Sequence, residues 1–260
     1  MLLAVSVGNT RTALGLFAGE HLVAAGAIAT RPAAGADECA VLARSWLARE
    51  DRAERPSALA LASVVPALTP VWRQTADRLG LGPAVAYGDG GRLGLRVRMA
   101  MPATAIGADR LLNAIAARWR YGQPVIVLDI GTALTLDVVG ADGSFVGGAI
   151  APGPTTAQAG LVRRQPALVP VTVGGAARAI GQDRAAALGA GLDYGSAGVL
   201  DGLAERARLE LAAPAAAVVA TGGLAAVLAP YSRSIDHVEP WLTLEGLRLW
   251  WADEAAGARP

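Results

Sequence analysis

Val5-Ser6-Val7-Gly8-Asn9-Thr10-Arg11-Thr12, near the start of the chain, is matched in the second half by Leu128-Asp129-Ile130-Gly131-Thr132-Ala133-Leu134-Thr135. In both stretches an apolar strand reaches a glycine, continues into hydroxyl or amide residues, and enters a second strand, at 13–17 or 136–139. This order predicts a β-hairpin with a polar turn in each half. Because an internal repeat indicates architecture before any single motif does, we expect two similar halves.

The segments around the two hairpins alternate between strand and helix patterns. In the first half we expect strands at 23–30 and 58–65 and helices at 36–50, 71–79 and 107–120. In the second half we expect strands at 125–128, 144–150 and 218–220 and helices at 156–161, 184–191, 197–211 and 244–256. Hairpins followed by helices in two similar halves indicate an α/β fold with a cleft between the halves. We place the boundary near residue 117, which gives domains 1–117 and 118–260.

The basic and sulfur-containing residues exclude several kinds of chemistry. All 23 Lys and Arg residues are arginines, so a Walker-type phosphate loop and Schiff-base catalysis are excluded. Cys39 is the single cysteine of the chain, which excludes an intramolecular disulfide and a cysteine-based zinc site. His21 and His237 are its two histidines and disfavour histidine-centred catalysis. We therefore expect chemistry based on carboxylates, arginines, hydroxyls and backbone amides.

Charge and apolar runs bear on location and partners. The formal net charge of +1 leaves no positive excess for nucleic acid. Residues 211–231 carry no charge and are long enough to span a bilayer, but their alanines and the breaks at Pro214, Gly222 and Gly223 favour a buried strand and turn. Residues 1–7 lack a basic leader and a cleavage site. We expect a cytoplasmic protein that binds neither nucleic acid nor a membrane.

Three glycine turns have the composition of a phosphate-binding site. A glycine at a strand end lets the backbone approach an anion closely, so that nearby N–H and hydroxyl groups donate to phosphate oxygens. Gly8-Asn9-Thr10, Gly131-Thr132 and Thr221-Gly222-Gly223 fit this description. Ordinary hairpin turns also favour glycine and asparagine, which is the better interpretation of any one turn alone. The duplication of the polar turn shifts the balance toward binding.

Gly107-Ala108-Asp109-Arg110 stands at the start of a predicted helix. Asp109 can cap that helix, or it can act as a general base for a hydroxyl that attacks phosphorus. Arg110 can hold a carboxylate or phosphate through two parallel hydrogen bonds, or it can form a surface ion pair. The residues themselves leave both alternatives open at both positions.

Taken in order, these motifs resemble those of the type III pantothenate kinase family, which belongs to the superfamily of acetate kinase, sugar kinases, Hsp70 and actin. The resemblance runs nearly end to end. It rests on Gly8-Asn9-Thr10, Ser63-Val64-Val65-Pro66, Gly107-Ala108-Asp109-Arg110, Asp129-Ile130-Gly131-Thr132-Ala133, Gly147-Gly148-Ala149-Ile150-Ala151-Pro152-Gly153, Tyr194-Gly195, Thr221-Gly222-Gly223 and Leu242-Thr243-Leu244-Glu245-Gly246-Leu247. It implies duplicated ribonuclease-H-like halves, as in actin-like ATPases, with an interdomain cleft.

The resemblance also implies an activity. It is the ATP-dependent phosphorylation of pantothenate to 4'-phosphopantothenate, the first step of coenzyme A biosynthesis, with Mg²⁺ and with K⁺ or NH₄⁺ as cofactors. Family members are dimers, so a homodimer is expected. Asp109 would be the proton acceptor, and Asp129 would bind the monovalent cation. The implied ATP contacts are Ser6, Gly8, Asn9, Thr10, Arg11, Thr132, Gly222 and Gly223, and the implied pantothenate contacts are Met99, Gly107, Ala108, Asp109, Arg110 and Arg184.

Three positions depart from the family pattern. Ser6 replaces an aspartate that helps to hold magnesium, and serine offers no charge to a hard cation. Met99 replaces a tyrosine that lies against the substrate, and Arg184 replaces a threonine that helps to bind pantothenate. Two hypotheses remain open. The chain is a working kinase, slow or shifted to another small acidic acceptor, or it is a catalytically impaired homologue that acts as a binding or regulatory accessory protein.

Overall fold

The computed structural model describes residues 1–50, 55–91 and 93–257. Contacts divide the chain into two units. Unit 1 comprises Met1–Arg96, Ala100–Ala116 and Trp241–Pro260, and unit 2 comprises Val97–Met99 and Ala117–Pro240. One change of unit therefore falls between Ala116 and Ala117, next to the boundary expected at 117. The segment from Trp241 onward lies beyond that boundary, and its contacts group it with unit 1.

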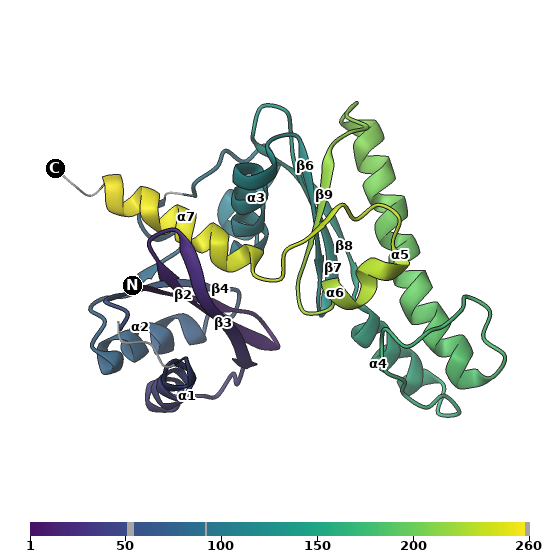
Figure 1. Ribbon diagram of the computed structural model, residues 1–260, viewed down its shortest axis with the longest axis horizontal. Helices are drawn as coiled ribbons and strands as arrows, with labels where there is room; N and C mark the ends of the chain where they lie inside the picture. The colour runs from purple at the N-terminus through teal and green to yellow at the C-terminus, as the bar shows by residue number, and fades with distance from the viewer. Residues whose placement is uncertain (51–54, 92, 258–260) are drawn as a thin grey trace. The chain divides into compact units, whose positions relative to one another are not determined.

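Unit 1 is built on a five-stranded sheet with the order β3-β2-β1-β4-β5 (Figure 1). The strands are β1 (Leu2–Val7), β2 (Arg11–Ala18), β3 (His21–Ala29), β4 (Ala58–Ser63) and β5 (Val85–Ala86). β1 pairs antiparallel with β2 and parallel with β4. β1 lies at the centre of the sheet with five of its six residues buried, as expected for a continuous apolar run whose two faces are both covered.

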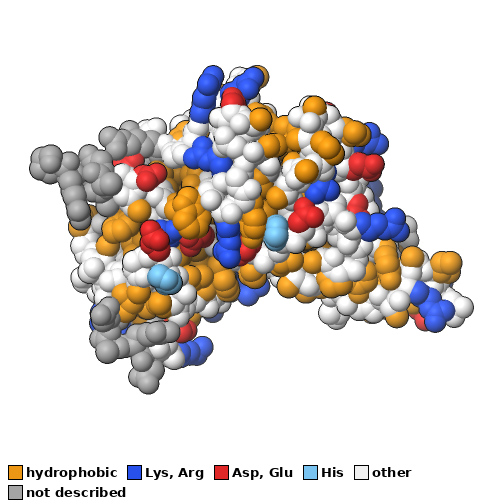
Figure 2. All heavy atoms as spheres, turned by 45° about the horizontal axis from the view of Figure 1, so that its top comes forward, with side chains coloured by type: hydrophobic (Ala, Val, Ile, Leu, Met, Phe, Trp, Pro, Cys, Tyr) orange, Lys and Arg blue, Asp and Glu red, His pale blue; other side chains and the backbone are white. Residues whose placement is uncertain are grey.

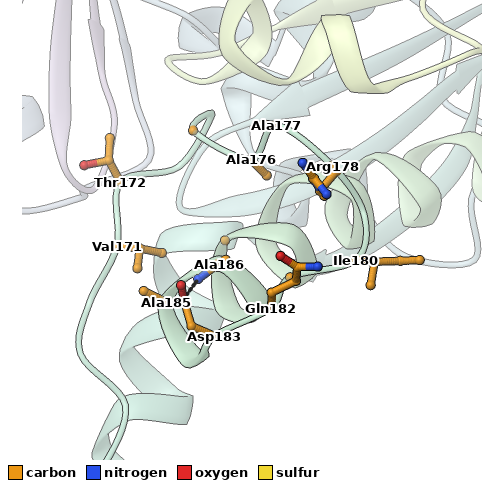
Figure 3. Close-up of a pocket in the computed structure, with 13 residues that line it drawn as sticks. Val171, Thr172, Ala176, Ala177, Arg178, Ile180, Gln182, Asp183, Ala185 and Ala186 are labelled. Atoms are coloured by element: carbon orange, nitrogen blue, oxygen red, sulfur yellow. Dashed lines mark hydrogen bonds between the residues drawn. The ribbon is translucent and has the colours of Figure 1, made fainter.

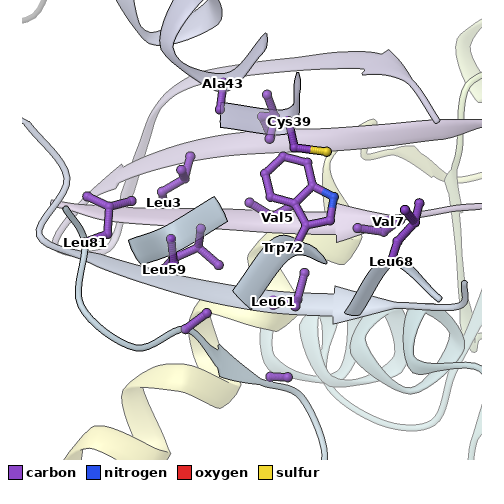
Figure 4. Packing of buried hydrophobic residues seen from close by; sticks show 14 of the residues in the cluster. Leu3, Val5, Val7, Cys39, Ala43, Leu59, Leu61, Leu68, Trp72 and Leu81 are labelled. Atoms are coloured by element: carbon purple, nitrogen blue, oxygen red, sulfur yellow. The ribbon is translucent and has the colours of Figure 1, made fainter. Parts of the chain in front are cut away.

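Alternate residues of β1 face two different hydrophobic clusters, because successive side chains of a strand point to opposite faces. Leu3, Val5 and Val7 pack against α1 (Ala36–Arg49) and α2 (Leu68–Leu79). Trp72 of α2 is 1% exposed and lies among these side chains beside Cys39 (Figure 4). Leu2 and Ala4 face the other cluster, to which α3 (Ala108–Tyr121) and α7 (Leu242–Gly257) contribute Leu112, Ile115, Leu244, Leu247 and Trp250.

Unit 2 repeats this arrangement. Its sheet has the order β10-β9-β6-β7-β8, with β6 (Val125–Ile130), β7 (Ala133–Val139), β8 (Phe145–Pro152), β9 (Ala217–Thr221) and β10 (His237–Val238). β6 pairs antiparallel with β7 and parallel with β9, as β1 does with β2 and β4. The sequence echo therefore corresponds to the central hairpin of each unit. In both copies the second strand begins earlier than predicted, at Arg11 and at Ala133.

The helices of unit 2 are α4 (Pro154–Arg164), α5 (Arg184–Glu210) and the short α6 (Ala225–Leu228). The prediction of two helices at 184–191 and 197–211 was wrong, because α5 is continuous over 27 residues. Glycine weakens a helix by about 1 kcal/mol without breaking it. Leu188, Leu192 and Leu200 bury one side of α5 across the glycine-rich middle. Within the part of the chain that the structure describes, no helix is both long and apolar enough to cross a membrane.

Candidate active site

The turn between β1 and β2 is fixed by hydrogen bonds to its backbone, and its polar side chains are exposed to solvent. The Gly8 N–H donates to the Arg11 carbonyl at 3.0 Å, and a Cβ on Gly8 would lie 2.9 Å from that oxygen. Thr30 donates its hydroxyl to the Gly8 carbonyl at 2.8 Å and its N–H to the Thr10 carbonyl at 3.0 Å. The side chains of Asn9, Thr10 and Arg11 are exposed. A rigid turn with exposed polar side chains suits the cradling of an anion.

Ser6 lies two residues before this turn, on the central strand. It pairs with Ala13 of β2 and with Ala62 of β4, and its side chain is half-buried. Of the protein groups that hold Mg²⁺, the carboxylate is the usual one, commonly one or two together with phosphate oxygens of the substrate. The Ser6 hydroxyl provides no such charge, so a magnesium ion here would be bound chiefly by ATP itself.

The start of α3 lies at the same edge of the unit 1 sheet. The Val64 N–H, just after β4, donates to the Val7 carbonyl at 3.0 Å. A Cβ on Gly107 would lie 3.7 Å from Val64 Cγ1 and 2.5 Å from Asp109 Oδ1. Gly107 therefore lies between the strand end and the carboxylate. The predicted residues Gly8 to Arg11 and Gly107 to Arg110 are thus placed on one edge of unit 1.

Asp109 is half-buried, and its surroundings affect its affinity for a proton. Its Oδ1 accepts the Arg110 N–H at 2.8 Å, which is a contact of the helix-capping kind. Burial raises the pKa of Asp109, while this hydrogen bond and the Arg110 guanidinium oppose the rise. A carboxylate with a raised pKa accepts a proton more readily than an ordinary one, because a general base works best when its pKa approaches the operating pH.

A second group of predicted residues lies at the end of β6 in unit 2. Asp129 pairs with Thr221 of β9. Gly222 follows Thr221 with a φ of +92°, and a Cβ on it would overlap Asp129 Oδ1 and lie 2.8 Å from the Ile130 N and O atoms. Since both the conformation and the space require glycine, the backbone at Gly222 forms a wall against the Asp129 carboxylate.

The turn after β6 is fixed by the start of α4. The Thr132 carbonyl accepts the Gly153 N–H at 3.0 Å and the Thr156 hydroxyl at 2.6 Å. A Cβ on Gly153 would overlap the Gly131 carbonyl oxygen. Sequence reasoning assigned no role to Gly153 or Thr156, although Gly153 closes one of the quoted motifs. Asp129, Thr132 and Gly222 are thereby brought to one edge of unit 2, and Gly223 follows directly in the chain.

The remaining predicted acceptor residues lie elsewhere in unit 2. Met99 ends a short segment that contacts β8, where the Arg98 N–H donates to the Phe145 carbonyl at 2.8 Å. Arg184 is the first residue of α5 and is exposed. The preceding Asp183 caps the helix, accepting the Ala186 N–H at 2.8 Å. Whether Met99 and Arg184 contact an acceptor stays a prediction.

Sequence reasoning missed a pocket beside Arg184. Its volume is about 530 Å³, and it lies between the loop 171–183 and the first turns of α5 (Figure 3). Arg178 and Gln182 of the loop and Ala185 and Ala186 of the helix line it. A Cβ on Gly181 would overlap the backbone of α5 at Ala187. Glycines in a segment without strand or helix periodicity were the one available signal of this loop.

The described residues offer little clustering of charged or metal-binding side chains. On the face shown in Figure 2, arginine side chains are dispersed among acidic and apolar ones. Among the residues with described placement, no group of three or more His, Cys, Asp or Glu side chains could hold a metal ion.

Comparison with known proteins identifies the family. The family model described as type III pantothenate kinase matches residues 2–206. The chain belongs to the type III pantothenate kinase family. The type III pantothenate kinase of Frankia casuarinae is 42% identical over 250 residues, which cover 96% of this chain and 98% of that protein. The type III pantothenate kinase of Rubrobacter xylanophilus is 41% identical over 265 residues and is matched over the full length of both chains.

Solved structures share the fold at low sequence identity. A conserved putative Baf family transcriptional activator from Campylobacter jejuni has a TM-score of 0.62 at 16% identity, over 98% of this chain and 99% of that one. Component A of (R)-2-hydroxyglutaryl-CoA dehydratase from Acidaminococcus fermentans has a TM-score of 0.56 at 14% identity, over 98% of both chains. The expected α/β fold of the actin-like ATPases is confirmed.

Membership of the type III pantothenate kinase family also establishes the reaction. The chain is a kinase that phosphorylates pantothenate with ATP and Mg²⁺, in the first step of coenzyme A biosynthesis. The functional prediction made from the ordered motifs is confirmed at this level.

Proposed function

We propose that Asp109 of this pantothenate kinase accepts the proton of the pantothenate hydroxyl as that oxygen attacks the γ-phosphorus of ATP. The bond from the γ-phosphorus to the β,γ-bridging oxygen breaks, and ADP leaves. The observation that carries this role is the half-buried Asp109 carboxylate, whose pKa burial raises, at the same sheet edge as the Gly8 turn. In this proposal Gly107, Ala108 and Arg110 line the acceptor beside it.

The ATP phosphates lie, in this proposal, on the glycine turns. The N–H groups and side chains of Asn9, Thr10 and Arg11 donate to phosphate oxygens, with Thr132, Gly222 and Gly223 forming the corresponding contacts of unit 2. Since the chain has no lysine, positive charge at the phosphates comes from arginine and from the cations. Phosphoryl transfer depends on positioning and on neutralising charge, so each of these contacts bears on turnover.

Three finer features belong to the same proposal. Asp129 holds K⁺ or NH₄⁺, which is supported by its half-buried carboxylate against the Gly222 backbone. Arg184 pairs with the pantothenate carboxylate in place of a threonine contact, with Met99 lying against the acceptor. The enzyme works as a homodimer in the cytoplasm, where ATP is available, as the family resemblance implies.

The test of the catalytic role is an assay of ADP formation with pantothenate, Mg²⁺ and a potassium salt. Asp109→Asn keeps the shape of the side chain and removes the base, so we expect kcat to fall by roughly 10²–10⁴-fold. Asp77→Asn, an exposed carboxylate of α2, is the matched control and should keep full activity. If Asp109→Asn turns over as fast as the natural protein, Asp109 is not the base.

A second candidate function is favoured by Ser6. A kinase that lacks the magnesium-assisting carboxylate could lose several kcal/mol of transition-state stabilisation, and each 1.36 kcal/mol is about a factor of ten in rate. Such a protein would still bind ATP and could serve as an accessory factor. Ser6→Asp distinguishes the two. ADP formation that appears only in Ser6→Asp supports the accessory role, and robust formation by the natural protein excludes it.

A further inference from the structure

Asp193 is a fully buried carboxylate in the middle of α5. Its Oδ1 accepts the Gly174 N–H at 2.7 Å, and its Oδ2 accepts the Ala176 N–H at 2.9 Å. These partners precede it by 19 and 17 residues, so both bonds cross from the helix to the loop 171–183. Hydrogen bonds to an ionised acceptor are roughly twice as strong as neutral ones. Asp193 therefore fastens this loop to the side of α5.

The same loop is confined from a second side. Gly174 has a φ of +90°, and a Cβ on it would overlap Val227 Cγ1 of α6. The positive φ favours glycine at this position, and a side chain there would also have to displace Val227. The loop backbone thus passes close to α6 at Gly174, and the two oxygens of Asp193 bind it to α5.

The fastened segment forms part of the pocket beside Arg184. Gly175 and Ala176 line this pocket of about 530 Å³ together with Arg178, and the first turns of α5 line its other side (Figure 3). One of the two bonds to Asp193 comes from Ala176, a lining residue. A shift of the loop would therefore change the shape of the pocket and the position of the Arg178 guanidinium.

We propose that Asp193 is a positioning residue of the acceptor site. It does not touch the substrate but holds residues 174–176 so that the loop and the amino end of α5 present a preformed pocket to the acceptor. This inference rests on the proposed role of Arg184 in pantothenate binding. A residue with this role changes the apparent affinity for the acceptor and leaves phosphoryl transfer itself nearly unchanged, because the bound substrate meets the same catalytic groups.

The kinetic test compares Asp193→Ala and Asp193→Asn with the natural enzyme. Losing both charge-assisted bonds is expected to raise the KM for pantothenate about tenfold or more, with kcat and the KM for ATP within about twofold. Asp193→Asn keeps one acceptor oxygen and should show a smaller rise. An unchanged KM for pantothenate in Asp193→Ala overturns the proposal, and if that variant does not fold, an unchanged KM in Asp193→Asn does so.

Asp201 supplies a matched control on the same helix. It also fastens a loop to α5, accepting hydrogen bonds from the Ser232 and Ser234 hydroxyls and from the Arg233 N–H. That loop does not line the pocket beside Arg184. Asp201→Ala should lower the melting temperature without raising the KM for pantothenate. An equal rise in KM in Asp201→Ala would show a general loss of stability and overturn the positioning role.

Amide hydrogen exchange tests the loop independently of activity. The Gly174 and Ala176 amides should exchange at least about tenfold faster in Asp193→Asn than in the natural protein, while the Ala186 amide, bonded to Asp183, should be unchanged. Unaltered exchange at both loop amides overturns the proposal. If Asp109→Asn is as active as the natural protein, the proposed catalytic role of Asp109 fails, and the exchange result still decides whether Asp193 fastens the loop.

Discussion

Gly222→Ala tests whether the backbone after β9 forms the wall of the Asp129 site. The φ of +92° at Gly222 disfavours alanine by about 1 kcal/mol, and part of this is offset because alanine loses less freedom on folding. The added carbon would also overlap Asp129 Oδ1 and lie 2.8 Å from two backbone atoms of Ile130. Overpacking of this kind costs about 1–3 kcal/mol. We expect a total loss of about 1.5–4 kcal/mol.

Gly122→Ala is the matched control, because Gly122 has a φ of +77° and no heavy atom within 4 Å of an added Cβ. Gly122→Ala should lower the free energy of unfolding only through its unfavourable backbone conformation, by about 0.5–1 kcal/mol. In thermal unfolding, Gly222→Ala should melt roughly 2–10 °C below Gly122→Ala. Equal melting temperatures would refute the claim of close packing at Asp129.

The same pair of variants tests the cation site. Displacement of the Asp129 carboxylate should raise the potassium concentration for half-maximal ADP formation about tenfold in Gly222→Ala and leave it unchanged in Gly122→Ala. A potassium dependence that is equal in both variants and the natural enzyme would separate Asp129 from cation binding, even where the loss of stability is as expected.

Two further predictions concern Asp109 and the core of unit 1. Because burial raises the pKa of Asp109, kcat/KM should rise with pH through a midpoint above the usual aspartate value of about 3.9, and Asp109→Asn should abolish that limb. The folded state holds this proton more tightly than the unfolded chain, so the contribution of Asp109 to stability is largest at low pH and is lost as the pH rises through the folded pKa. Asp109→Asn should accordingly not lower the melting temperature at pH 7. Trp72 is 1% exposed and Trp119 is 59% exposed. Trp72→Ala should therefore lower the free energy of unfolding in urea by about 3–5 kcal/mol, against about 0.5 kcal/mol for Trp119→Ala. Similar losses in the two variants would contradict the packing around Trp72.

The central hairpins were predictable because their information is local. β1 and β6 are apolar runs that end in a glycine, and the polar residues that follow mark the turn before any tertiary contact is considered. β5 and β10 have two residues each, which is too short for a period of two to be detected. The continuity of α5 depends on buried leucines, of which Leu200 packs against the sheet. A local pattern interrupted by Gly191, Gly195 and Gly198 does not show that support.

The site residues also differ in whether the local sequence could indicate them. Gly8, Asp109 and Gly222 stand in recognisable motifs, so the sequence indicated them as candidates. Asp193 did not stand out, because an aspartate within a helix ordinarily faces solvent. Its bonds to Gly174 and Ala176 come from residues 19 and 17 positions away and depend on how the loop folds back. The pocket beside Arg184 also depends on how the loop folds back onto α5, so the local sequence did not indicate it.

The glycines of this chain differ in how closely other atoms surround them. This difference helps to predict the effect of Ser6 on ATP binding. At Gly8 and Gly222, which lie in predicted ATP turns, and at Gly153, which packs against the turn at Gly131 and Thr132, an added Cβ would come within 3.0 Å of a backbone atom. At Gly191, Gly195, Gly198 and Gly202 of α5 an added Cβ would meet nothing within 4 Å. The ATP turns are thus shaped by backbone packing that does not involve the Ser6 side chain.

It follows that ATP binding and turnover should respond differently to Ser6. Binding to the folded state raises the melting temperature by mass action, and the turns that provide it are complete without a carboxylate at position 6. Ser6→Asp should therefore leave the ATP-dependent rise in melting temperature within about 1 °C of that of the natural protein, while it increases kcat through better neutralisation of charge in the transition state. Because the chain contains no lysine to supply that charge, the increase in kcat should exceed any gain in affinity. A variant that gained ATP affinity in proportion to its rate would show instead that Ser6 limits binding.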